Sequence, residues 1–297
     1  MFFSRFRGFL CTVLLLAGVG IGMPVLAAAA DGYAGAAACA GCHAEIAAAF
    51  AKNIHSHAGK WEAGFQGCES CHGPGEMHAS SSDPNLIRNL RKLDAKNANA
   101  TCLGCHEKGK LVHWTGSQHE MRGLGCTDCH SIHRGNRHLL REASESDVCA
   151  RCHLDIKAQL LRSSHHPIRE GKTTCTDCHN PHGTIAPKLI SANTINDKCY
   201  ECHAEKRGPF LFEHKPVVDD CTNCHTAHGS NHDKLLVKKV PWLCQECHSG
   251  HGGNSYPLTP GQSPYKTVGV PGLYRACPNC HANIHGSNSP SGAFFTK

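Results

Sequence analysis

Twenty of the 21 cysteines in this 297-residue sequence fall into ten copies of one short pattern, Cys-x-x-Cys-His. The cysteine pairs are Cys39/Cys42, Cys68/Cys71, Cys102/Cys105, Cys126/Cys129, Cys149/Cys152, Cys175/Cys178, Cys199/Cys202, Cys221/Cys224, Cys244/Cys247 and Cys277/Cys280. The histidines that end the ten copies are His43, His72, His106, His130, His153, His179, His203, His225, His248 and His281. Thiols and imidazoles at such spacing are groups that bind metals and metal-containing cofactors.

Three chemistries compete for this pattern. Disulfides would explain an even number of cysteines in an exported protein, but they do not require a histidine after every second cysteine. Zinc sites use Cys-x-x-Cys pairs without needing an adjacent histidine each time. Covalent c-type haem does need it, because both thiols attach the porphyrin and the next residue binds its iron. The repeated pattern therefore predicts ten covalently bound c-type haems, with the ten motif histidines as proximal iron ligands.

The second axial ligands must be histidines as well, because Met77 and Met121 are the only methionines beyond residue 30. Candidates that closely follow a motif are His78, His133, His182, His228, His251 and His285. Candidates that precede a motif are His55, His119, His165 and His214. A histidine three residues after the proximal one cannot reach the opposite face of the same iron, so we expect it to serve a neighbouring haem. These ten are the predicted distal ligands, with alternates at His57, His113, His138, His166 and His232. The choices between His55 and His57, and between His165 and His166, stay open.

Residues 1–30 are typical of a secretory signal peptide. Arg5 and Arg7 precede an apolar run, and small residues at positions 27–30 offer cleavage sites. A retained membrane anchor is the alternative interpretation. A spanning helix needs about 20 apolar residues, however, and glycines interrupt the apolar run here. We therefore expect export to the periplasm, with residues 31–297 forming one haem-binding domain.

The remaining chain is poor in the side chains that build a core. Leu, Ile, Val and Phe together make up about 18% of the sequence, which is the level typical of disordered chains. The motifs in the middle of the chain are evenly spaced, and alternate motifs differ, so the repeat is about 45–50 residues long with two haems in each. We expect haems to replace the missing core. The predicted fold is mostly irregular with short α-helices, elongated around a chain of ten haems, with little or no β-sheet.

The two motif types predict different local structure. In one type a helix carries the motif, as over residues 148–161, with N-cap candidates Asp147 in one copy and Asn196 or Asp197 in another. The other type runs directly into Gly and Pro, which indicates a loop. Two longer spacers interrupt the series. A short helix is predicted over 86–93 and an extended loop over 249–276.

The formal net charge of +6 could suggest a nucleic-acid partner. Each haem, however, brings two propionates and adds roughly −1 in the oxidised state. Ten haems would make the loaded protein acidic, which argues against nucleic acid.

With CHGPGEMH near the start and CPNCHANIHGSNSPSG at the end, the ten motifs resemble those of the DmsE/MtrA/PioA-type periplasmic decahaem c-type cytochromes, from about residue 39 to 295. The resemblance implies a rod of ten bis-histidine haems, often described as two pentahaem halves, which would divide here near residues 155–170. It implies an electron-transfer conduit across the outer membrane, inserted in an outer-membrane β-barrel protein. Periplasmic or inner-membrane cytochromes, and an extracellular cytochrome or reductase, would exchange electrons with it.

Two other functions compete with a conduit. A soluble periplasmic shuttle would carry the same haems without a barrel partner. A multihaem reductase would need one iron with an open distal position, whereas the chain has enough histidines to close every iron and no variant motif. No catalytic residues are predicted, so we expect a redox carrier rather than an enzyme.

Overall fold

The computed structural model describes residues 32–134, 138–248 and 277–296. Within these ranges the chain forms short helices and isolated β-bridges without any strand, and the longest α-helix has nine residues. The predicted fold class is therefore confirmed. None of the described helices has the length and apolar character needed to cross a bilayer. The predicted signal peptide, the predicted loop over 249–276 and His251 lie outside the described residues.

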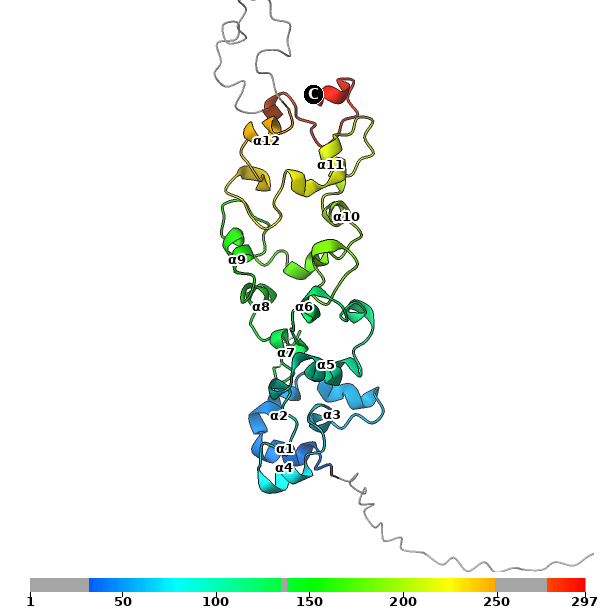
Figure 1. Cartoon of the computed structure of the whole chain (residues 1–297), viewed down its shortest axis with the longest axis vertical. Coiled ribbons are helices and arrows are strands. Elements are labelled where there is room, and N and C mark those ends of the chain that lie inside the picture. Colours follow the sequence, from blue (N-terminus) through cyan, green and yellow to red (C-terminus); the bar gives the residue numbers. More distant parts are fainter. Residues whose placement is uncertain (1–31, 135–137, 249–276, 297) are drawn as a thin grey trace, which may run out of the picture.

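The chain runs along the long axis of an elongated molecule from the blue N-terminal end to the red C-terminal end, although some neighbouring helices are out of strict order (Figure 1). The α-helices are α1 (Ala36–Cys42), α2 (Ala44–Phe50), α3 (Cys68–His72), α4 (Glu76–Ser81), α5 (Ala95–Leu103), α6 (Gln118–Met121), α7 (Cys126–Cys129), α8 (Glu145–Ala150), α9 (Leu154–Leu160), α10 (Ile195–Tyr200), α11 (Lys215–Asp219) and α12 (Trp242–Gln245). The 3-10 helices are η1 (Ile54–Lys60), η2 (Leu90–Lys92), η3 (Gly109–Leu111), η4 (Cys175–Asp177), η5 (Pro187–Leu189), η6 (Ala204–Lys206), η7 (Cys221–Asn223), η8 (Asp233–Leu235), η9 (Cys277–Asn279) and η10 (Gly292–Phe294).

The motif helices begin earlier than the sequence predicted. Ser144 caps α8 and Thr194 caps α10, because their hydroxyl oxygens accept the backbone N–H of Asp147 and Asp197. The predicted caps were therefore wrong, since Asp147, Asn196 and Asp197 lie in the first turns of these helices. Each aspartate instead accepts a hydrogen bond from the hydroxyl of the capping residue, at 2.6 Å in α8 and 2.8 Å in α10.

Two other predicted helices also differ from the structure. The helix predicted over 148–161 is split, because α8 ends at Ala150 and α9 begins only after His153, whose backbone is not helical. The helix predicted over 86–93 is reduced to η2. Asp83 accepts the backbone N–H of Asn85, and His72 accepts that of Arg88, so these groups are not available for a helix.

Side chains alone build almost no core. Among the described residues the buried apolar ones are Ala58, Ala98, Trp114, Leu139, Val148, Leu160 and Ile190. Large apolar side chains elsewhere stand open, with Ile185 at 92%, Leu211 at 79% and Phe294 at 75% exposed. Seven buried residues cannot offset the conformational entropy of ordering such a chain, so another apolar body must complete the fold.

Candidate haem-binding sites

Nine of the ten motif histidines lie against a histidine from outside the motifs. The pairs are His43–His78, His72–His133, His106–His55, His130–His182, His153–His119, His179–His228, His203–His166, His225–His285 and His248–His214. Their ring centroids are between 5.7 and 6.4 Å apart. The tenth motif histidine is His281, whose predicted partner His251 lies outside the described residues.

This separation matches two imidazoles that bind one iron from opposite faces. Metal–nitrogen bonds of about 2.0 Å, with each nitrogen about 1.1 Å from its ring centre, put the two centroids about 6.2 Å apart. No group of three or more His, Cys, Asp or Glu that could hold a bare metal ion occurs in the part of the chain that the structure describes. The paired rings beside a Cys-x-x-Cys therefore fit a covalently held haem better than a zinc ion.

Burial keeps several of the distal candidates in the form that binds iron. It is the largest cause of the lowered pKa of His55, His133, His182, His214, His228 and His285. A lowered pKa favours the neutral imidazole at neutral pH, and neutral imidazole is the metal-binding form.

Histidines just after a motif face the iron position of a different motif. His133 follows His130 in sequence but faces His72, and His182 follows His179 but faces His130. The same exchange brings His228 to His179 and His285 to His225. Each of these motifs thus contributes one histidine to its own ring pair and one to the ring pair of the preceding motif of its type. This arrangement ties successive sites together along the rod.

One distal candidate differs from the sequence prediction, which named His165. In the structure His166 faces His203, and its Nδ1 donates to the carbonyl of Ala227 at 2.6 Å. His165 points elsewhere, with its Nε2 3.2 Å from the carboxylate of Glu170. His166 therefore takes the place of His165 as the candidate.

Between His55 and His57, the structure places His55, the residue named from the sequence, against a motif histidine. The Nε2 atoms of His55 and His106 are 3.4 Å apart, whereas His57 is exposed.

Alanine substitutions should separate the two adjacent histidines. His166→Ala is expected to leave one ferric haem high-spin, because His203 would then be its only axial ligand, while covalent attachment is unchanged. His165→Ala is the matched control and should keep every haem low-spin. Electron paramagnetic resonance with a covalent haem count checks both. The assignment is wrong if His165→Ala produces the high-spin haem.

Cysteines connect consecutive motifs without a break. The first cysteine of one motif is close enough to hydrogen bond with the first cysteine of the next, in Cys39–Cys68, Cys102–Cys126, Cys149–Cys175, Cys199–Cys221 and Cys244–Cys277. Burial first, and then the neighbouring thiol, raises the pKa of Cys199 and of Cys244 to about 11.

The second cysteines link one such pair of motifs to the next pair. The electrostatic contacts are Cys71–Cys102, Cys129–Cys152, Cys178–Cys199 and Cys224–Cys247. In each of them the pKa of the first-named thiol is raised. Burial is the largest cause, and the partner cysteine adds to it. The ten motifs are therefore linked one to the next, in sequence order, through their cysteines.

In seven of the ten motifs the two cysteines differ in exposure, which the sequence did not predict. Every first cysteine is half-buried, whereas the exposed second cysteines are Cys42, Cys105, Cys152, Cys178, Cys202, Cys247 and Cys280. Polypeptide alone therefore leaves these seven predicted attachment residues open to solvent. All twenty motif cysteines are free thiols in the structure.

Six of the exposed cysteines are nevertheless held in place by their motifs. Each donates its backbone N–H to the carbonyl of the first cysteine of the same motif, at 3.1 to 3.3 Å, in Cys105, Cys152, Cys178, Cys202, Cys247 and Cys280. Cys105 also contributes to the raised pKa of Cys71, after burial and Cys102, and Cys202 contributes to that of Cys178. The turn thus keeps the two thiols of these motifs together, and haem attachment at the cysteines stays a prediction.

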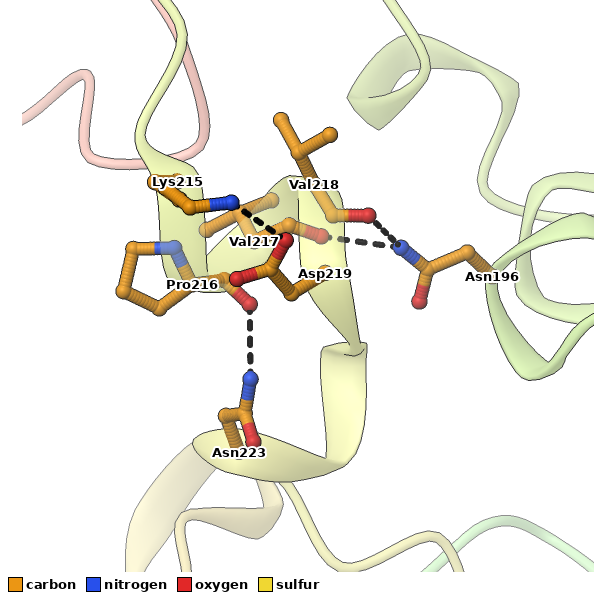
Figure 2. A network of polar contacts seen from close by, with 7 residues as sticks. All are labelled: Asn196, Lys215, Pro216, Val217, Val218, Asp219 and Asn223. Carbon is orange, nitrogen blue, oxygen red and sulfur yellow. Dashed lines mark hydrogen bonds and ion pairs between the residues drawn. The ribbon is translucent and has the colours of Figure 1, made fainter.

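A buried asparagine joins two motifs of a pair (Figure 2). Asn196 in α10 is 8% exposed, and its amide donates to the carbonyls of Val217 and Val218 at 2.9 Å each. Its carbonyl oxygen accepts the backbone N–H of Cys221 at 2.7 Å. Asn196 thereby connects the motif in α10 to the first residue of the following motif. It also connects α10 to α11, which begins directly after His214.

Equivalent side chains occur in other pairs, and sequence reasoning missed all of them. Asn99 accepts the N–H of Cys126 at 2.7 Å, and the carboxylate of Glu145 accepts the N–H and the hydroxyl of Thr176. Glu69 is 3% exposed and accepts three backbone N–H groups. For the first two, the available signal was a polar residue three or four positions before the first cysteine of a helical motif.

Removing the Asn196 side chain should weaken the structure. Asn196→Ala deletes three part-buried hydrogen bonds and leaves their backbone groups without this partner, which costs about 1–3 kcal/mol. Asn223→Ala is the matched control, because the exposed Asn223 amide makes only one bond, to Pro216. Chemical unfolding of the haem-loaded protein measures both. Equal stabilities for the two variants would contradict the role given to Asn196.

Comparison with known proteins agrees with these sites. Residues 165–208 and 214–253 match a family described as "Doubled CXXCH motif", and residues 68–144 match "Cytochrome c-type protein NrfB-like". The chain is similar to a "Multiheme cytochrome MtrA" of Shewanella baltica, with 38% identity over 89% of this chain and 81% of the relative. A "High-molecular-weight cytochrome c" of Nitratidesulfovibrio vulgaris is 24% identical over 47% of this chain and 24% of that protein. Among solved structures, an undecahaem cytochrome from the S-layer of Carboxydothermus ferrireducens has 20% identity, with a TM-score of 0.15 over 78% of this chain and 32% of that one.

Proposed function

The chain belongs to the MtrA family of multihaem cytochromes, and from this premise we propose that it carries electrons across the outer membrane. It is an electron-transfer protein with covalently bound c-type haems. We propose ten haems, one at each Cys-x-x-Cys-His motif, with residues 1–30 as a signal peptide and residues 31–297 as the exported domain. The proposed distal ligands are those of the nine ring pairs, together with His251 opposite His281.

The unbroken order of the sites carries this proposal. Consecutive motifs contact each other through their cysteines from Cys39 to Cys277, and the helices that bear them follow the long axis of the molecule (Figure 1). A bilayer with its headgroups is about 40–45 Å thick, so a line of redox centres can cross it where a single site cannot.

The residues of the chain determine what such a line can do. A haem bound at each motif would supply one-electron redox chemistry. The motif histidine and its ring partner would hold its iron between them, which would leave no position for a small molecule and favour electron transfer between neighbouring sites over catalysis. Ligation by histidine alone also favours lower reduction potentials than ligation by methionine does.

A rod with exposed apolar side chains and no spanning helix among the described residues needs a partner to hold it in a membrane. We propose an outer-membrane β-barrel protein as that partner. Cytochromes of the periplasm or inner membrane would meet one end of the rod, and an extracellular cytochrome or reductase the other.

Lipid vesicles that enclose a redox dye test this proposal. With the chain and its co-expressed barrel in the vesicle wall, an external reductant should reduce the enclosed dye, whereas vesicles with the barrel alone should not. Failure of the chain to co-purify with any barrel, together with no dye reduction, would support a soluble shuttle instead. A strong high-spin ferric signal from the native protein would support a reductase with an open iron.

A further inference from the structure

Four motifs are followed by a segment that returns to the motif, which we call the return turn. The return turns are residues 138–141, 187–191, 233–237 and 294–296. Three of them form a β-bridge with the proximal histidine itself, namely His130–Leu140, His179–Ile190 and His225–Leu236. In the fourth, the carbonyl of Phe295 accepts the backbone N–H of Asn283, two residues after His281, at 2.9 Å.

The return turns have an unusual backbone. Apart from Ser82, every described residue other than glycine with a positive φ lies in one of them. These residues are Leu139, Lys188, Leu189, Lys234, Leu235 and Phe295, with φ between 53 and 59°. L-residues with side chains pay a steric penalty in this conformation, so its recurrence at equivalent places indicates that the surrounding structure uses it.

The left-handed backbone directs a carbonyl oxygen at the proximal histidine. Nδ1 of His179 donates to the carbonyl of Lys188 at 2.8 Å, and Nδ1 of His225 donates to that of Lys234 at 2.8 Å. At the other two turns the acceptors are the carbonyls of His138, at 3.1 Å from His130, and Phe294, at 2.6 Å from His281.

A fifth motif makes the same bond by another route. Nδ1 of His72 donates to the carbonyl of Arg88 at 2.7 Å, although Arg88 does not have a positive φ. The backbone N–H of Arg88 donates in turn to the carbonyl of His72 at 3.0 Å. A backbone carbonyl therefore holds the proximal histidine at this site without the strained backbone of a return turn.

Motifs of the helical type lack this bond. For His43, His106, His153 and His248, no backbone carbonyl accepts Nδ1 in the part of the chain that the structure describes, and Nδ1 of His203 is 3.9 Å from the carboxylate of Glu205. Ring orientation is more uniform at the return turns than among the helical-type motifs, although the pairs of His43 and His248 have similar angles of 16 and 23°. The described pairs with a return turn, those of His130, His179 and His225, have interplanar angles of 17–18°. The helical-type pairs range from 16 to 69°.

We propose that the return turn is a positioning device that lowers the reduction potential of the haem at each of the four motifs that carry one. Its carbonyl accepts a hydrogen bond from Nδ1 and so fixes the plane of the proximal imidazole. The same hydrogen bond makes Nε2 a stronger electron donor to the iron, which favours the ferric state. Sites with a return turn therefore have lower potentials than the same sites would have without it. Reduction there takes one electron from a neighbouring haem, breaks no bond and leaves the proton on Nδ1.

Lys188 allows a test through the backbone alone, because its side chain is exposed. Glycine and asparagine tolerate the left-handed conformation, whereas valine resists it. All three substitutions remove the same charge. Lys188→Val should raise the potential of one haem, with about a fivefold shift in its reduction equilibrium, the factor that corresponds to one net hydrogen bond. Lys188→Gly and Lys188→Asn should leave that potential unchanged.

Potentiometric titration and electron paramagnetic resonance of the haem-loaded variants measure this effect. The inference is overturned if Lys188→Val titrates like Lys188→Gly. Should Lys188→Val lose its haem, Lys188→Ala, with a smaller penalty, gives the same comparison against glycine. The inference rests on the proposed bis-histidine ligation, and the two fail differently. A high-spin haem in the native protein contradicts the ligation, whereas identical titrations with every haem low-spin contradict the return turn alone.

Discussion

Made in a host that cannot attach haem, residues 31–297 are expected to be largely unfolded. The described chain buries only seven apolar residues, and only Ala98 among them is below 5% exposed. At about 25 cal/mol per Å² of buried apolar surface, so small a core cannot balance about 1–2 kcal/mol of backbone entropy per ordered residue. Attachment of an apolar porphyrin at each motif would supply the missing burial, so that cofactor binding and folding become one process.

Circular dichroism and small-angle scattering measure this directly. The chain without haem should show little helix and the dimensions of an expanded polymer, while the same chain from a host with the attachment machinery should be an elongated, helical rod. A haem-free chain with the helix content and dimensions of the loaded protein would contradict the account.

Gly229→Ala is expected to dislodge an axial ligand. Gly229 follows His228, and a Cβ atom there would lie 1.9 Å from the carbonyl oxygen of Gln159 and 2.7 Å from its carbon. Backbone atoms of α9 cannot yield as a flexible side chain would, so the loop must move. His228 moves with it, away from His179, whose ring centroid is 6.1 Å from its own. Overpacking of this kind costs about 1–3 kcal/mol.

The expected result is one high-spin haem, lower stability and unchanged covalent attachment, measured by electron paramagnetic resonance and chemical unfolding. Gly183→Ala should behave similarly at the neighbouring site, because its Cβ would lie 2.0 Å from the carbonyl oxygen of His113. Gly59→Ala is the matched control, since the nearest atom, the carbonyl oxygen of Phe65, is 4.0 Å away. Low-spin spectra for Gly229→Ala would contradict the contact between α9 and this loop.

The sequence predicted the chemistry of the sites better than their local geometry. A motif of fixed spacing determines which residues can attach a haem, and the fold class followed from short, evenly spaced motifs. Whether His165 or His166 faces His203 depends on contacts with distant segments, such as the hydrogen bond from His166 to Ala227, which the residue types do not reveal. Asn196 was read as a possible cap because asparagine favours that position, but it lies in the first turn of α10, two residues after the cap Thr194, and its amide bonds to α11.

Other features could not be predicted because they come from contacts between distant segments. Gly229 has to be glycine because of Gln159, which lies 70 residues earlier in the sequence. The left-handed backbone of Lys188 and Lys234 is disfavoured by local propensity and is held by the bridges to His179 and His225.

An experimental structure of the haem-loaded protein is the sharpest test of the proposed line of haems. An iron is expected between the two rings of each of the nine described pairs, including His203 with His166, with the sites in sequence order along the rod. An iron with an open or non-histidine axial position, or a break in that order, would contradict it.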